Sequence, residues 1–365
     1  MKIIHCADLH LESKMETNLE LEKAKERKNE IILTFQRMVN YAKENDVKAI
    51  IIAGDMFDKK RITNKTKNLV KDIISSNSNI DFFYLKGNHD ESQVFEEDEI
   101  PSNLKTFTSE KWTYYNYDEE NITIAGIEFG KLNDHDIYSS LLLDKDKINI
   151  VVMHGQEVSN NNLSNENKSA DVINLKELKN KNIDYLALGH IHTYKKEKLD
   201  KRGVYCYSGC LEGRGFDECN EKGFVLLNIE NSKIESTFIP FAKRTIYEID
   251  VDLTDANSNT EIENRINEKI KDISKESIVK IVFTGECEIG QEHNVDYFYN
   301  EYKDSFYALK IEDKPHIKID YMKYKNDRSL KGEFIRMVLD KNNLSEEEKN
   351  KIIITGIKAL SNEEL

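Results

Sequence analysis

The sequence predicts an α/β protein in which helices cover the outside of layered sheets. Short apolar runs bounded by polar loops recur through the first two thirds of the chain, and some are apolar on consecutive residues, as at Ile50–Ile52. Such runs are typical of strands covered on both faces. Between the first two runs, apolar residues recur at helical spacing from Ile31 to Ala42. This strand–helix–strand order indicates α/β layering.

Eight strands are expected in this first part of the chain. Each one is a short run with few polar residues, followed by a polar or glycine-containing turn. The expected strands are Ile3–Cys6, Ala49–Ala53, Phe82–Leu85, Ile122–Ala125, Ile148–Met153, Tyr185–Leu188, Tyr205–Ser208 and Phe224–Ile229.

A second, smaller α+β unit is expected to begin near Lys243. We expect strands at Thr245–Val251 and Val279–Thr284, a helix at Glu261–Ile273 and a further strand at Ile317–Tyr321. Because 365 residues exceed one ordinary domain, we divide the chain into a main domain at 1–242, a small α+β domain at 243–323 and a tail at 324–365.

The tail is predicted to form two short amphipathic helices. An apolar stripe runs from Leu330 to Leu339, and Ser345 with Glu348 forms a capping box that opens the second helix. Two such helices have little partner surface of their own. They either pack on the rest of the chain or bind another protein.

Composition narrows the classes of function. A formal net charge of -14 argues against a protein that coats nucleic acid by bulk electrostatics, although bound divalent cations can reverse the field at a nuclease site. No apolar run approaches the roughly 18 residues of a membrane span, and we expect no signal peptide. Five cysteines without a CxxC pair predict reduced thiols and a cytoplasmic location; a thiolate site at Cys206 and Cys210 is the alternative.

Polar residues follow five of the expected strands just beyond their carboxyl ends. In layered α/β sheets these ends converge on one rim, where ligands bind. Glycine accompanies four of the five groups and allows tight turns and close approach. The groups are Asp8 and His10; Gly54 and Asp55; Gly87, Asn88, His89 and Asp90; His154 and Gly155; and Gly189, His190 and His192.

These side chains predict a metal centre with two ions. The mixture of imidazole, carboxylate and amide groups suits manganese, iron or zinc better than calcium, which prefers oxygen ligands alone. Seven ligands are too many for one tetrahedral ion but suit two octahedral ions with a shared ligand. Two ions about 3.5–4 Å apart can acidify a water and stabilise displacement at phosphorus.

The five groups, in this order, resemble the motifs of the calcineurin-like metallophosphoesterase superfamily, which implies a helix-flanked β-sandwich. The resemblance assigns Asp8, His10, Asp55 and His192 to one ion, and Asp55, Asn88, His154 and His190 to the other, with Asp55 bridging. It excludes His89 from the ligands and implies that this residue protonates or stabilises the leaving oxygen.

Two features beside these motifs have alternative explanations. Asp58 occupies the position of the acid that orients the catalytic histidine in many family members, and an ordinary capping aspartate explains it equally well. The basic residues Lys59, Lys60 and Arg61 follow directly. They either contact phosphates or belong to the solvated surface.

Three further stretches resemble the SbcD family of bacterial DNA-repair nucleases: Met1–Leu11, Ala53–Asp58 and Ser208–Asp217. The resemblance implies a small α+β capping domain that contacts DNA, and tail helices that bind a coiled-coil ATPase of the SbcC type. It also implies a homodimer formed through helices that flank the third motif. Residues available for such a contact are Leu69, Ile73, Ile74, Val94, Phe95 and Leu104, which also fit an ordinary core.

The sequence therefore predicts a manganese-dependent DNA nuclease that acts at ends or breaks. Two alternatives remain: a phosphodiesterase for small nucleotides with the same metal centre, and a catalytically inert scaffold that recruits partners through the tail.

Overall fold

The computed structural model describes residues 1–13, 15, 19, 21–58, 62–90, 100–130, 134–158, 171–287, 293–314, 316–317 and 327–360. The chain divides into two compact units, and the division falls between Ile246 and Tyr247. Lys59, Lys60, Arg61, Val94 and Phe95 lie outside the described residues, as does most of the strand expected at Ile317–Tyr321.

The first unit contains two six-stranded sheets. In the first sheet, β1 to β4 are parallel, and β13 and β14 continue it with antiparallel pairing. Its strands, in spatial order, are β14 (Lys233–Pro240), β13 (Gly223–Glu230), β1 (Lys2–Cys6), β2 (Ala49–Ala53), β3 (Asp81–Leu85) and β4 (Leu104–Thr106).

The second sheet has a parallel centre with an antiparallel strand at each edge. Its strands, in spatial order, are β11 (Lys195–Lys198), β12 (Val204–Tyr207), β10 (Tyr185–Gly189), β7 (Ile148–His154), β6 (Ile122–Gly126) and β5 (Thr113–Tyr117). A separate short parallel pair joins β8 (Gln156–Val158) to β9 (Val172–Asn174).

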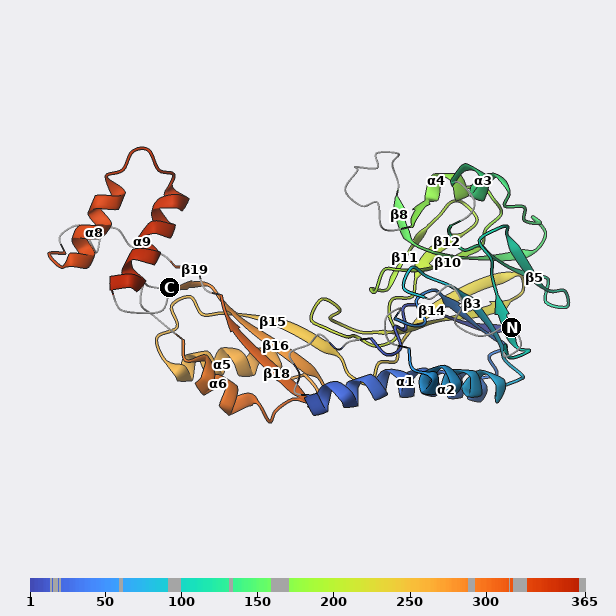
Figure 1. Ribbon diagram of the computed structural model, residues 1–365, viewed down its shortest axis with the longest axis horizontal. Helices are drawn as coiled ribbons and strands as arrows, with labels where there is room; N and C mark the ends of the chain where they lie inside the picture. Colours follow the sequence, from blue (N-terminus) through green and yellow to red (C-terminus); the bar gives the residue numbers. More distant parts are fainter. Residues whose placement is uncertain are drawn as a thin grey trace. The chain divides into compact units, whose positions relative to one another are not determined.

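The two sheets pack face to face, and helices cover their outer faces (Figure 1). Residues such as Ile51 and Phe83 of the first sheet meet Ile124 and Val152 of the second in a shared core. On the outer face of the first sheet lie α1 (Leu21–Glu44) and α2 (Asn64–Ser75), and on that of the second lie α3 (Asp134–Ser139) and α4 (Leu175–Leu178). The predicted helix-flanked α/β sandwich is thus confirmed.

All eight strands expected in this unit are present, with their ends shifted by no more than two residues. The strands that the sequence did not predict include the edge strands β5, β11 and β14. The helix foreseen from Ile31 to Ala42 begins earlier, at Leu21. Within the described ranges, no helix is long and apolar enough to cross a membrane.

The second unit contains a three-stranded sheet and two helices that share one core. The strands expected at 245–251 and 279–284 are found one residue away or less from those limits, while the sequence did not indicate α6 or β18. The elements are β15 (Ile246–Asp252), α5 (Asn259–Ile270), β16 (Ile278–Thr284), α6 (Val295–Tyr302) and β18 (Ala308–Asp313), with a small pair of β17 (Glu286–Cys287) and β19 (His316–Ile317).

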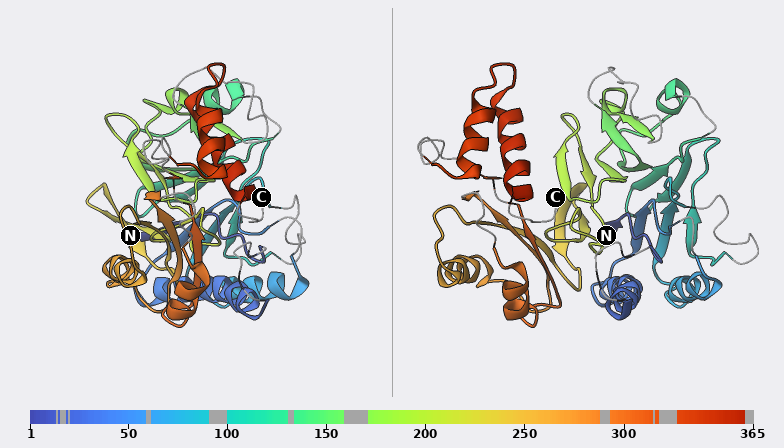
Figure 2. Two further views of the ribbon diagram at one scale, coloured as in Figure 1. Left: turned by 90° about the vertical axis from the view of Figure 1, so that its left-hand side faces the viewer. Right: turned by 60° about the vertical axis from the view of Figure 1, so that its left-hand side comes forward.

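The tail forms a hairpin of two helices, α8 (Leu330–Leu339) and α9 (Glu346–Leu360) (Figure 2). Ile335, Val338, Ile353 and Ile357 pack between them. The predicted capping box is confirmed, because Ser345 N–H donates to Glu348 Oε2 at 2.8 Å and Glu348 N–H donates to Ser345 Oγ at 3.3 Å.

Candidate metal centre

The loops after β1 and β2 continue the pairing of these two strands beyond their ends. Asp8 N–H donates to the Gly54 oxygen at 3.0 Å, and His10 N–H donates to the Asp55 oxygen at 2.9 Å. A bridge between Leu11 and Phe57 extends the contact further. The main chain therefore brings the first two polar groups together before any side chain is considered.

Several of these residues have a left-handed backbone conformation. The φ angles are 53° at Asp8, 43° at His10, 53° at Asp55 and 102° at His190. For residues with a Cβ such conformations cost roughly 1–3 kcal/mol each and cluster at functional sites. The main-chain hydrogen bonds between the two loops offset this cost and hold the side chains in position.

Five of the expected ligands form two groups, with their ligating atoms within 4.8 Å of one another. One group is Asp8, His10 and His192, and the other is Asp8, Asp55 and His154. Four of these five side chains are buried, and His192 is partly exposed. The ends of four strands, from both sheets, thus meet at one place.

Asp55 lies between the histidines of the two groups. Its Oδ2 is 3.7 Å from His10 Nε2 and 3.4 Å from His154 Nε2, while its Oδ1 accepts a hydrogen bond of 2.8 Å from His89 N–H. Burial opposes the charge of Asp55, but the hydrogen bonds and positive charge from His154 and His10 hold its pKa well below its usual value. Asp55 is therefore an ionised carboxylate that faces both groups.

The atoms that face the centre are imidazole nitrogens and carboxylate or amide oxygens, which are ligand types that fit divalent metal ions. His154 donates from Nδ1 to the Ala53 oxygen at 2.9 Å, so its Nε2 faces Asn88 Oδ1 at 3.1 Å. His10 Nε2 likewise faces His192 Nε2 at 3.2 Å. Burial lowers the pKa of His154, but the carboxylate of Asp55 outweighs it and raises this pKa to about 9, so in the ion-free protein Nε2 carries a proton that an ion would displace. The site thus favours positive charge where ions would bind.

His190 takes a different position from the other expected ligands. Its main-chain N–H donates to both oxygens of Asp8, at 2.9 and 3.1 Å. Its ring lies edge-on to that of His154, with 5.5 Å between the centroids. His190 therefore borders the second group without belonging to the close set of ligating atoms.

The predicted catalytic histidine lies beside the centre and faces solvent. The His89 side chain is 47% exposed, and its Nδ1 lies 3.9 Å from Asp58 Oδ1. This distance exceeds that of a hydrogen bond and lies within the range of an ion pair. The His89 ring also stands edge-on to the His10 ring at 5.0 Å.

Two carboxylates that support the centre were not foreseen as such. Asp90 accepts hydrogen bonds of 2.9 Å from the N–H groups of Phe57 and Gly87. It therefore joins the loop after β3 to the loop after β2. Burial raises its pKa to about 6. Glu218 accepts from Nδ1 of His192 at 2.7 Å. It directly follows the stretch that resembles SbcD, and no feature of the sequence singled it out.

The alternative of a thiolate site is not supported. Cys206 and Cys210 are free thiols in buried positions, and neither belongs to the metal-type clusters found among the described residues. Burial raises the pKa of Cys206 to about 11 and that of Cys210 well above its usual value. Both thiols are thus protonated at neutral pH.

A helix-flanked sandwich that gathers imidazole and carboxylate groups on its strand ends defines a metal-dependent phosphoesterase. The chain belongs to the calcineurin-like phosphoesterase family, whose model matches residues 1–194. The resemblance noted in the sequence is therefore confirmed, and a centre for two divalent metals is a property of this family.

Similarity to known proteins extends over more of the chain than the family model matches. The DNA double-strand break repair protein Mre11 of Sulfolobus acidocaldarius is 24% identical over 335 residues, which cover 86% of this chain and 85% of that protein. Mre11 of Aeropyrum pernix is 24% identical and matches 74% of this chain and 67% of its own length. The uncharacterized metallophosphoesterase YhaO of Bacillus subtilis is also 24% identical, and the match covers 78% of this chain and 72% of that protein.

Solved structures with a similar arrangement include TT1561 of Thermus thermophilus, with a TM-score of 0.40 and 13% identity. This match covers 65% of the present chain and 98% of that one. A dimetal phosphatase from Danio rerio has a TM-score of 0.38 and 8% identity, and the match covers 66% of the present chain and 99% of that one.

Proposed function

We propose that this protein is a DNA nuclease that uses two divalent ions, Mn²⁺ by preference, to hydrolyse phosphodiester bonds at DNA ends or breaks. The observation that carries the proposal is the length of the match to Mre11. It covers 86% of the chain, whereas the family model matches residues 1–194. The similarity to a break-repair protein thus includes the second unit as well as the phosphoesterase unit.

The proposed ligands divide between the two ions, four to each, with Asp55 shared. Asp8, His10, Asp55 and His192 would hold one ion, and Asp55, Asn88, His154 and His190 the other. When bound, ions at these positions lower the pKa of water and stabilise negative charge that develops on the phosphate. The ligand types at the centre, together with the ionised Asp55, suit this role.

His89 is the proposed catalytic acid. Its main chain is fixed to Asp55 while its side chain reaches solvent, where a substrate can approach. From this position the imidazole protonates or stabilises the departing sugar oxygen. Asp58, whose Oδ1 lies 3.9 Å from His89 Nδ1, is the proposed partner that orients the imidazole.

We infer that an ATPase partner of the SbcC type supplies much of the affinity for DNA. The proposed DNA-contact domain is acidic, with 18 aspartates and glutamates against 12 lysines and arginines in residues 243–323. Lys280 and Lys310 on its sheet already pair with acidic side chains. The net negative charge of this domain therefore opposes contact with phosphates, which dominate affinity for DNA.

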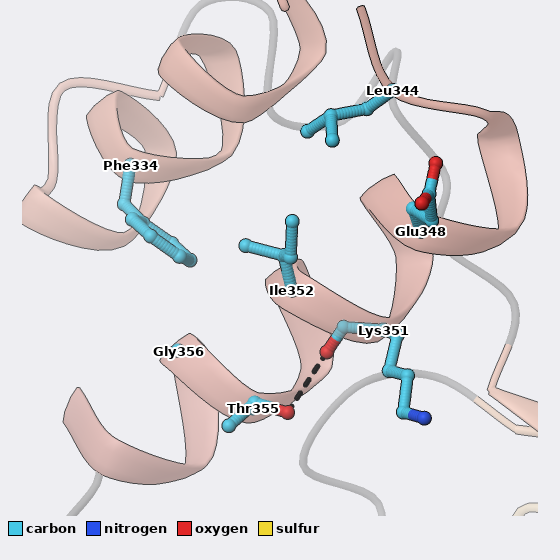
Figure 3. A pocket seen from close by; sticks show the side chains of 7 residues that line it. All are labelled: Phe334, Leu344, Glu348, Lys351, Ile352, Thr355 and Gly356. Atoms are coloured by element: carbon cyan, nitrogen blue, oxygen red, sulfur yellow. Dashed lines mark hydrogen bonds between the residues drawn. The ribbon is translucent and has the colours of Figure 1, made fainter.

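The proposed binding site for the ATPase lies on the helical hairpin. A pocket of about 480 Å³ is lined by Phe334 of α8, Leu344 and, on α9, Ile352 and Gly356 (Figure 3). Such a pocket suits the apolar anchor of a helix from a coiled coil. This use accounts for an apolar surface on two helices that otherwise pack on each other.

The homodimer and the cytoplasmic location also remain proposals. Of the residues considered for a dimer contact, Ile73, Ile74 and Leu104 belong to the core. Leu69 on α2 is exposed and remains available. A dimer through this helix would therefore use the face that contains Leu69.

The test compares wild type with His89→Ala on two substrates in Mn²⁺, linear duplex DNA and bis-p-nitrophenyl phosphate, each with and without the ATPase. We expect wild type to cleave DNA, and we expect His89→Ala to lose cleavage while it still binds both ions. Calorimetric titration with Mn²⁺ reports the binding. Full DNA cleavage by His89→Ala would contradict the role of His89.

Two other outcomes would overturn the proposed substrate or the proposed activity. Hydrolysis of the small ester alone, even with the ATPase present, would indicate a small-nucleotide phosphodiesterase. Tight binding of the ATPase by a wild-type protein that cleaves neither substrate would indicate a scaffold.

A further inference from the structure

His192 is held by a carboxylate on the side of its ring that faces away from the centre. Glu218 Oε1 lies 2.7 Å from His192 Nδ1. A carboxylate accepts, so the proton of the imidazole is on Nδ1 and the lone pair is on Nε2. This Nε2 is the atom that faces His10 Nε2 at 3.2 Å. The contact with Glu218 therefore determines which ring nitrogen is available as a ligand.

Glu218 is itself fixed by Arg214. The Nε of Arg214 donates to Glu218 Oε1 at 3.0 Å and its Nη2 at 2.5 Å, and the main-chain N–H of Arg214 donates to Glu218 Oε2 at 2.8 Å. The Arg214 Nη2 also lies 3.1 Å from His192 Nδ1. Both of these nitrogens carry hydrogen, so this last contact is no hydrogen bond. Glu218 is the acceptor that the arginine and the histidine share.

The same segment also holds the main chain of His192. The buried Lys222 donates from Nζ to the His192 oxygen at 2.8 Å. The N–H of Cys210 donates to this oxygen at 3.3 Å, and Cys210 pairs with Ala7, directly before Asp8. Residues 210–222 thus fix both the backbone and the ring of His192 relative to the loop that contains Asp8 and His10.

We propose that Glu218 is a positioning residue of the metal centre, which sets the tautomer of His192 and aims its Nε2 at one ion. The inference rests on the proposed two-ion site. Carboxylates behind ligating histidines fix the tautomer and raise the basicity of the ligand, and their loss typically weakens metal binding 10- to 100-fold.

The effect is confined to one of the two ions. The tautomer of His154 is set by the hydrogen bond from its Nδ1 to the main-chain oxygen of Ala53. No substitution of Glu218 removes this oxygen. In the part of the chain that the structure describes, the hydrogen bonds of the Glu218 side chain join it to His192, Arg214 and Cys210, and none of these is assigned to the second ion. A change at Glu218 should therefore separate the two binding events.

The experiment is a calorimetric titration of the full chain with Mn²⁺ after treatment with a chelator. We expect wild type to bind two ions. We expect Glu218→Leu, which keeps the volume and removes the acceptor, to bind one ion as wild type does and the other roughly 10- to 100-fold more weakly. Glu218→Asp, which shortens the side chain but keeps the charge beside Arg214, should lose less affinity at the same ion.

A second readout follows the tautomer directly. Long-range ¹H–¹⁵N spectra of the ion-free protein, with the His192 signals assigned through His192→Gln, should show the proton on Nδ1 in wild type. In Glu218→Leu we expect this pattern to be lost. A purely structural role for Glu218 would leave the tautomer unchanged.

The matched control is Glu212→Leu. Glu212 is equally buried in the same segment, but its partners include Arg27 at 3.1 Å, Thr34 at 2.7 Å and the main-chain N–H of Lys243, and none of these is a proposed ligand. This variant should lose stability and still bind two ions. Wild-type affinities in both Glu218 variants would overturn the inference, as would an equal loss in Glu212→Leu. A wild type that binds no ions would instead refute the metal centre itself.

Discussion

The Nδ1 of His154 donates a hydrogen bond to the main-chain oxygen of Ala53, 2.9 Å away. His154 ends β7 in one sheet and Ala53 ends β2 in the other, so this single bond connects the two layers at the metal centre. Gly189 lies against the same oxygen. A Cβ at Gly189 would lie 1.9 Å from the Ala53 oxygen and 2.8 Å from His154 Nδ1.

We predict that Gly189→Ala disrupts the centre. The added methyl group must displace the Ala53 oxygen, a main-chain atom, and with it the hydrogen bond that orients His154. Overpacking of this kind typically costs about 1–3 kcal/mol. Thermal unfolding should therefore show a less stable protein, and titration with Mn²⁺ should show the loss of the ion that His154 holds.

Gly126→Ala is the control for this variant. Gly126 lies in the same sheet as Gly189. A Cβ at Gly126 would lie 2.5 Å from the ring of Phe107, which is not a proposed ligand. Gly126→Ala should lower stability without a change in ion affinity. Equal ion binding by Gly189→Ala and wild type would show that the Ala53 oxygen does not need to stay in place.

The buried His5 predicts a loss of stability in acid. Burial lowers the pKa of His5 to about 3 in the folded protein, whereas in an unfolded chain it is about 6.5. Below pH 6.5 the unfolded state therefore binds a proton that the folded state does not. The stability present above pH 6.5 is lost as the pH falls toward 3, by about 1.4 kcal/mol for each pH unit.

The comparison is between wild type and His5→Gln, whose amide does not titrate and can still bond to Tyr185, the present partner of His5 at 2.9 Å. Free energies of unfolding from urea titrations at pH 7.5 and pH 5, with a chelator present, should fall by about 2 kcal/mol more in wild type. Parallel losses in the two proteins would show that His5 is protonated when folded.

The sequence predicted the central strands and the ligand groups for the same physical reason. Strands covered on both faces are apolar on consecutive residues, as at Ile50–Ile52, and the polar residue that ends such a strand stands out. The edge strands lack this signal. β11 consists of Lys195, Lys196, Glu197 and Lys198, a charged composition that is typical of exposed sheet edges and also of loops.

The supporting residues of the centre could not be predicted in this way. Glu218 lies 26 positions after His192, outside any strand, and its role depends on how the segment 210–222 folds back. Asp90 was visible beside His89, but only the fold shows that its oxygens face the N–H groups of Phe57 and Gly87. Sequence motifs predict the ligands, and tertiary contacts indicate the residues that would orient them.

The position of Asp55 predicts that both ions depend on it. Asp55→Asn keeps the shape and an oxygen for the N–H of His89 but removes the charge that faces His10 and His154. We expect both ions to bind more than about 100-fold more weakly, a larger loss of affinity than is typical when a residue behind a ligand is replaced. Asn88→Ala should weaken only one of them. Titration with Mn²⁺ separates these cases, and one ion retained at full affinity in Asp55→Asn would exclude a bridging role.

The helical hairpin yields a prediction about the proposed ATPase partner. Ile352 lines the pocket on α9 and is 40% exposed, whereas Met337 on α8 is 63% exposed and lies outside the pocket lining. Because buried apolar anchors dominate such interfaces, Ile352→Glu should weaken binding of the coiled coil at least tenfold, and Met337→Glu should change it little. Both substitutions leave the core residues Ile335 and Ile353 in place.

Calorimetry with the isolated coiled coil of the ATPase measures this difference, and circular dichroism checks that both variants keep their helices. Ion binding should be identical in all three proteins, because the hairpin contributes none of the proposed ligands. Equal affinity of wild type and Ile352→Glu for the coiled coil would reject the pocket as its binding site. A loss confined to Met337→Glu would place the contact on the exposed surface of α8, because an apolar side chain there contributes to the interface only where the partner covers it.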